Sequence, residues 1–234
     1  MDKKRYSFAW RRARAHMGVW QPVLSIIGMI GIGLLANAND PTARIIGLSA
    51  VAGIGAMVAG VQAAFIFAPA DEPALELVLS APRPVAYLII ERLIVLAALN
   101  GAAALVGSAA FPLLAPSLAR SIEVGDQLLR WFPPFVCMTG LGLALGIITK
   151  KSAFGVLLVI LLVGAMLFGG PGVLTALVEW GWVAHLFLPP EAFTADQILI
   201  NRALLIAIGA ALIAYSIALS REGESHLSAA VNAG

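Results

Sequence analysis

LRWFPPFVCMTGLGLALGIITKKSAFGVLLVILLVGAMLFG, residues 129 to 169, decides the fold of this chain. It consists of two apolar runs, Leu129–Thr149 and Ser152–Gly169, separated by Lys150 and Lys151. Each run, as a helix, is long enough to cross a hydrocarbon core of about 30 Å. The pattern predicts two membrane-spanning helices joined by a short basic connection.

The rest of the chain has the same character. Of its 234 residues, 60% are hydrophobic and 12% are charged, about half the charged fraction of a soluble domain. Four more apolar runs follow the same length rule: Val19–Ala38, Ala43–Ala68, Val85–Leu114 and Ile198–Leu219. No segment alternates as membrane strands do, so helices are the expected spanning structure. We predict an all-α polytopic membrane protein with six transmembrane helices in one domain, residues 1–234.

The distribution of Lys and Arg predicts the orientation. With six spans, both termini share one side with the second-to-third and fourth-to-fifth connections. That side holds eleven Lys and Arg residues, and the other side holds four. The positive-inside rule then places both termini in the cytoplasm and the chain in the cytoplasmic (inner) membrane. The net charge of +2 is too small to suggest a nucleic-acid partner.

The first 18 residues predict an amphipathic helix lying in the membrane interface. Its apolar and aromatic residues share one helical stripe: Tyr6, Trp10, Ala13, Met17 and Trp20. Most of the basic residues, including Arg11, Arg12 and Arg14, lie off this stripe and suit lipid headgroups. The alternative is a basic tail that only fixes orientation. Although Ala36–Ala38 fits a signal-peptidase site, the preceding basic and apolar regions are long for a signal peptide, so we expect the segment to be retained.

DEPALELVLSAPRP, residues 71 to 84, predicts a short cytoplasmic helix between the second and third spans. Asp71 or Glu72 can cap its start, Pro73 suits its first turn, and Pro82 ends it. Leu75, Val78 and Leu79 form an apolar face one turn long, which suits a groove on a partner. Glu76 and Arg83 could set its orientation there. The alternative is an interfacial helix that merely joins two spans.

The connection between the fifth and sixth spans, residues 170–197, is too polar to span the membrane but rich in Leu and Trp. The glycines and proline of residues 169–172 predict a break in the fifth helix, and Pro189 and Pro190 a second break. We expect one or two short re-entrant helices in the outer leaflet, packed on protein. The alternative is an interfacial loop with an aromatic belt.

Reactive chemistry is scarce. The three histidines are far apart in sequence, and neither an HExxH motif nor a P-loop occurs. Glu91 and Arg92, near the cytoplasmic end of the third span, fit an interfacial anchor. The single cysteine, Cys137, can form no intrachain disulfide. We therefore expect no catalytic, cofactor or metal site, and a chain that is not itself an enzyme.

Small residues predict where helices approach one another. Gly142 and Gly146 form a GxxxG pattern in the fourth span, and Gly55 and Gly60 lie in the second. Packing within one subunit is the better interpretation of such residues than a dimer contact. Because the spans look uniformly apolar, a substrate path is easier to build between two subunits than through one.

The chain resembles the permease subunits of ABC-2-type transporters. That family has an N-terminal amphipathic "elbow" helix, six spans with cytoplasmic termini, and a short helix of the form E-x-G-T-L-E-L-L-L-x-x-P between spans two and three. The matching stretch here is EPALELVLSAP, residues 72 to 82, with Pro73-Ala74 where the family often has Gly-Thr. Broken helices between spans five and six are also typical of the family.

The resemblance implies that residues 1–18 are the elbow helix and residues 71–84 a coupling helix that docks on a separate ATPase. It implies a permease, mostly of exporters, that works as a homodimer or heterodimer and passes ATP-driven motion to its spans. The path between subunits would be lined by the first, second and fifth spans. The alternatives are a non-transporting membrane scaffold or assembly factor, a lipid-modifying enzyme, and a haem-exporter-type permease of cytochrome c maturation.

Overall fold

The computed structural model describes residues 41–69, 84–114, 124–177, 185–186 and 193–232. This part of the chain is helical and contains no strand. Its helices are α3 (Pro41–Ala64), α5 (Val85–Leu114), α7 (Val124–Thr149), α8 (Ser152–Leu177) and α9 (Ala195–Asn232). The expected first span lies outside the described residues.

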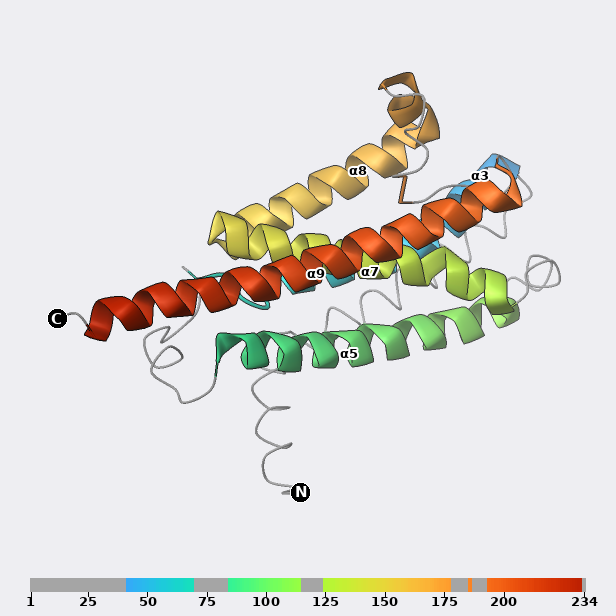
Figure 1. Cartoon of the computed structure of the whole chain (residues 1–234). Helices are drawn as coiled ribbons and strands as arrows, with labels where there is room; N and C mark the ends of the chain where they lie inside the picture. The colour runs from blue at the N-terminus through green and yellow to red at the C-terminus, as the bar shows by residue number, and fades with distance from the viewer. Residues whose placement is uncertain (1–40, 70–83, 115–123, 178–184, 187–192, 233–234) are drawn as a thin grey trace.

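The five helices lie along a common axis, and successive helices run in opposite directions (Figure 1). The start of α5, the turn between α7 and α8 and the end of α9 therefore lie at one end of the bundle. We call this the basic end, because the exposed Lys150, Lys151 and Arg221 lie there. The up-and-down order is the one that the hydropathy pattern predicts for these spans.

Among the described residues, three helical stretches are long and apolar enough to cross a membrane: Val85–Ala103, Leu128–Thr149 and Ala195–Arg221. Gly53–Ala64 and Ser152–Met166 are apolar but shorter. The chain is therefore an integral membrane protein built of helices. Several predicted ends coincide with observed ones, including both ends of α5, because each is set by a change from apolar to polar residues.

The predicted break of the fifth span at residues 169–172 is wrong. Helix α8 continues through this Gly- and Pro-containing stretch to Leu177. In apolar surroundings the alternative to a helix is an unpaired backbone, so Gly and Pro are tolerated where they would end a helix in water. Helix α7 likewise continues through Pro133 and Pro134.

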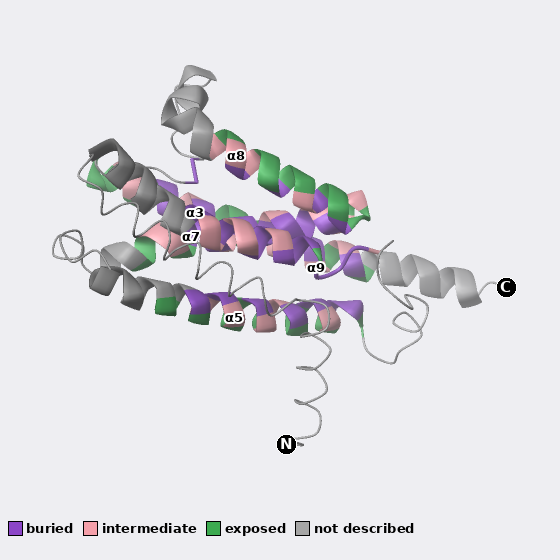
Figure 2. Cartoon of the chain, turned by 180° about the vertical axis from the view of Figure 1, so that it is seen from behind, coloured by how far each residue is buried: buried purple, intermediate pink, exposed green. Residues whose placement is uncertain are grey.

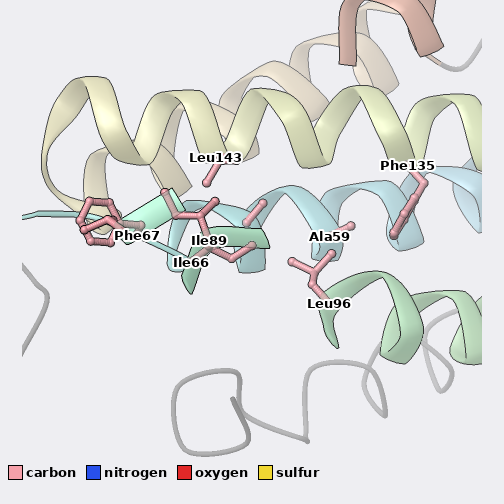
Figure 3. Close-up of a cluster of buried hydrophobic side chains, with 9 residues drawn as sticks. Ala59, Ile66, Phe67, Ile89, Leu96, Phe135 and Leu143 are labelled. Atoms are coloured by element: carbon pink, nitrogen blue, oxygen red, sulfur yellow. The ribbon is translucent and has the colours of Figure 1, made fainter. Parts of the chain in front are cut away.

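Helix α7 is the centre of the bundle. Of its membrane span, 61% is buried inside the structure, against 33% for α5 and 22% for α9. It packs against α3, α8 and α9, and the buried surfaces of the helices face one another (Figure 2). One hydrophobic cluster, which includes Ala59, Leu96, Phe135 and Leu143, joins α7 to α3 and α5 (Figure 3).

Glycines bring the α7 backbone into direct contact with two of its neighbours, α3 and α9. A β-carbon on Gly142 would overlap the carbonyl group of Gly60 on α3, and one on Gly146 would lie 2.5 Å from the carbonyl oxygen of Ala64. On the other side, a β-carbon on Gly209 of α9 would lie 2.5 Å from the Val136 carbonyl oxygen. The prediction that Gly142 and Gly146 pack within one subunit is confirmed.

We expect Gly142→Ala to destabilise the protein by about 1–3 kcal/mol, because two helix backbones must separate to admit a methyl group. The matched control is Gly164→Ala on α8, where an added β-carbon meets nothing within 4 Å. Thermal unfolding in detergent can be followed by maleimide labelling of Cys137, the chain's single cysteine, which is buried. Equal melting temperatures for the two variants would contradict the close contact.

The turn between α7 and α8 contains an unusual backbone conformation. Lys150 has a φ of 60°, in the left-handed region that favours glycine. Its N–H donates to the Ile147 carbonyl at 3.3 Å, and the Thr149 hydroxyl can donate to the Leu145 carbonyl at 2.7 Å. The turn thus satisfies the end of α7 and reverses the chain within two residues.

We expect Lys150→Gly to stabilise the protein by up to about 1 kcal/mol, since glycine adopts this φ without steric cost. The melting temperature of the variant should rise by roughly 2–4 °C in the same maleimide assay. Lys151→Gly removes the same charge at a residue without positive φ, and should not stabilise the protein. A gain in both variants would assign the effect to charge rather than to backbone strain.

Candidate functional site

The residues predicted to couple this chain to a partner lie outside the described part of the structure. They are Glu72, Leu75, Glu76, Val78, Leu79 and Arg83. The same holds for the predicted interfacial helix, with Tyr6, Trp10, Arg11, Arg12, Arg14, Met17 and Trp20. What the structure describes is the attachment of the segment 70–83 to the bundle, on both sides.

We call this attachment the α3–α5 junction: residues 65–69 after α3, with Val85, Ala86 and Arg92 of α5. Two hydrogen bonds close the end of α3, from Phe65 N–H to Gln62 O and from Ile66 N–H to Ala63 O, both 3.1 Å long. Residues 66–68 and residues 85–86 are all buried. The segment 70–83 is therefore fixed at both ends to packed protein.

Arg92 joins the two sides of the junction. It is 5% exposed, and its Nη1 donates a hydrogen bond to the carbonyl oxygen of Ile66. Carbonyl groups at and just beyond a helix end need partners outside the helix, and a guanidinium group is a strong donor. The interpretation of Arg92 as an interfacial anchor is wrong for this reason, whereas the neighbouring Glu91 is exposed.

A similar arrangement occurs at the opposite end of the bundle. Asn201 Nδ2 donates to the His185 carbonyl and Arg202 Nη1 to the Leu186 carbonyl, each at 3.0 Å. All four residues are buried, and Leu186 belongs to a cluster with Met138, Val159 and other apolar residues. Two residues of the connection between α8 and α9 thus enter the protein interior. Within the connection expected to hold the re-entrant helices, residues 178–184 and 187–192 lie outside the described part, so these helices stay a prediction.

A third polar contact lies between α3 and α5. Asn100 Nδ2 donates to Gln62 Oε1 at 2.5 Å and also lies 3.0 Å from the Leu96 carbonyl oxygen. Both side chains are buried, and Gln62 Nε2 has no hydrogen-bond partner among the described residues. The expectation of uniformly apolar spans is therefore wrong. The sequence does carry a signal for Gln62 and Asn100: each is a strongly polar residue inside an apolar run, and in a membrane such a residue points to an interior position.

Several buried polar groups of the described residues hold connections and helices in place. The buried polar groups are mostly amides, hydroxyls and guanidinium groups. The amides of Asn100 and Asn201 and the guanidinium groups of Arg92 and Arg202 donate to backbone carbonyls, whereas the hydroxyls of Thr139 and Ser216 have no hydrogen-bond partner among the described residues. No three His, Cys, Asp or Glu side chains in the described ranges gather as a metal site would require.

Comparison of the chain with protein-family models, with curated proteins and with solved structures finds no match. A functional assignment consequently depends on the residues and their arrangement.

The contact between Gln62 and Asn100 can be tested by a double-mutant cycle. We expect Asn100→Leu to cost about 1–2 kcal/mol, because it removes the donor of a buried Gln62 acceptor. Replacing both residues by Leu should cost about 1 kcal/mol less than the sum of the two single changes. Unfolding is measured by Cys137 labelling, with Ala102→Leu at an exposed position of α5 as control. Strict additivity would contradict the interaction.

Proposed function

We propose that this chain is the membrane-spanning permease subunit of an ABC-2-type transporter, an exporter, which acts with a separate ATPase. The observation that carries the proposal is the segment EPALELVLSAP, residues 72–82, in the connection between α3 and α5. The segment has the letters of a coupling helix, and both of its flanks are attached to buried parts of the bundle.

The position of this connection supports the proposal. Its flanks lie at the basic end, with the exposed Lys150, Lys151 and Arg221. By the positive-inside rule this end faces the cytoplasm, where an ATPase subunit and its ATP would be found. A coupling helix on the opposite side of the membrane could not reach such a partner.

In the proposed mechanism the apolar face of Leu75, Val78 and Leu79 docks in a groove of the ATPase. Glu76 and Arg83 set its orientation, and Asp71 or Glu72 caps the helix. ATP binding closes the ATPase dimer and hydrolysis resets it, and the docked helices carry this motion to two permease subunits. The N-terminal residues 1–18 would lie in the inner interface as the elbow helix.

The substrate path would lie between the two permease subunits, lined by the first, second and fifth spans. Helices α3 and α8, which correspond to the expected second and fifth spans, pack directly on each other. Helix α8 exposes a row of apolar side chains: Phe154, Leu157, Leu158, Ile160 and Leu161. Apolar walls favour an amphipathic or lipid-like cargo.

The proposal predicts that a P-loop ATPase copurifies with the tagged chain from native membranes, as identified by mass spectrometry and by ATP hydrolysis. We expect Glu76→Lys combined with Leu79→Asp to reduce the copurified ATPase at least tenfold. An apolar anchor replaced by a carboxylate in a groove typically costs 2 kcal/mol or more, which is roughly a thirtyfold loss of affinity.

The matched control is Glu91→Lys, which reverses a charge at an exposed position of α5 near the same end. It should retain the ATPase at the level of the unaltered chain. Equal recovery with the double variant would refute the role of residues 71–84 in coupling. Recovery of no P-loop ATPase with any form would refute the permease assignment and favour a membrane scaffold.

A further inference from the structure

Two buried arginines occupy equivalent places in the fold. Arg92 of α5 and Arg202 of α9 each lie seven residues after the first residue of their helix. Each donates a hydrogen bond to a backbone carbonyl of the connection that precedes that helix, Ile66 for Arg92 and Leu186 for Arg202. The two contacts lie at opposite ends of the bundle (Figure 1).

The contact at the α3–α5 junction is reinforced by apolar packing. Ile66 and Phe67 belong to the same buried cluster as Val85 and Ile89 on the first turns of α5. Figure 3 shows Ile66 and Ile89 side by side in this cluster. The chain on the two sides of segment 70–83 is therefore joined by both a polar and an apolar contact.

Such a junction resists separation. Drawing Ile66 away from α5 would take an acceptor from a guanidinium group that is buried in the protein, and a buried charged group that loses a partner is strongly destabilising. It would also expose apolar side chains from both elements. A displacement of the connection is therefore transmitted to α3 and α5 rather than absorbed between them.

We propose that Arg92 is a positioning residue for energy coupling, which makes the end of α3 and the start of α5 move as one unit. A force applied to segment 70–83 by a P-loop ATPase then reaches both helices together, and through α3 it reaches α7, against which α3 packs. This inference rests on the proposed function. Arg202 fixes a connection at the far end of the bundle and has no part in this route.

The experiment compares Arg92→Gln with Arg202→Gln in the complex of permease and ATPase, reconstituted in vesicles of inner-membrane lipids. Each change removes one buried guanidinium group that holds a connection, so each should lower the melting temperature in the Cys137 assay. For Arg92→Gln we expect the ATPase to copurify normally while the permease-dependent rate of ATP hydrolysis per complex falls at least fivefold. For Arg202→Gln we expect that rate to stay within twofold.

Two further measurements keep the test decisive. Arg92→Lys retains a cation and a hydrogen-bond donor, and should recover at least half of the lost rate of ATP hydrolysis. If Arg92→Gln fails to fold, Arg92→Lys should still fold. Amide hydrogen exchange of residues 65–68 should accelerate at least tenfold in Arg92→Gln and remain unchanged in Arg202→Gln. This second readout needs no ATPase.

The outcomes separate the two proposals. No P-loop ATPase on the unaltered chain would refute the proposed function, and the coupling role with it. If the ATPase copurifies but Arg92→Gln and Arg202→Gln lower the hydrolysis rate equally, Arg92 is merely structural and this inference alone is wrong. Unchanged exchange of residues 65–68 in Arg92→Gln would likewise overturn it.

Discussion

Gly142 lets the backbone of α7 touch that of α3, and Gly209 of α9 does the same on the other side of α7. In a membrane the burial of apolar side chains gives little gain, because lipid tails are as apolar as the protein interior. Close packing of backbones then supplies much of the attraction between helices. Because α7 is held on two sides in this way, α3 and α9 have fixed positions relative to it. The remaining contacts of the bundle build on this three-helix arrangement.

The positions of the helices create a second requirement, which polar side chains meet. Where a connection enters the apolar interior, its carbonyl groups lose water and need donors from the protein. Arg92 donates a hydrogen bond to the Ile66 carbonyl at one end, and Asn201 and Arg202 donate to the carbonyls of residues 185–186 at the other. These side chains are charged or polar because a backbone carbonyl group needs a hydrogen-bond donor at each place. The same chemistry explains why their burial is compatible with an otherwise apolar bundle.

Much of the helical architecture could be predicted from the sequence, because span ends are local properties. The change from apolar to polar residues defines α5 and the turn at Lys150, and the GxxxG spacing at Gly142 anticipates a close helix contact. The continuation of α8 to Leu177 could not be predicted, since the tolerance of Gly and Pro depends on surroundings. Nor could the burial of Arg92 or the pairing of Gln62 with Asn100, because each depends on which helices become neighbours. The roles assigned to residues 1–18 and 71–84 remain predictions.

The proposed function requires a point at which energy supplied by a separate ATPase enters the bundle. The point of entry must be a connection that is exposed to a partner and attached to more than one helix. Between α7 and α8 the basic end offers two residues, Lys150 and Lys151, which are too few to present a docking helix. The connection between α3 and α5 has the length for one turn or more of helix and is joined to both helices through Ile66 and Arg92. The attachment of its flanks and its sequence motif therefore both support the proposal that a partner acts on the bundle through this segment.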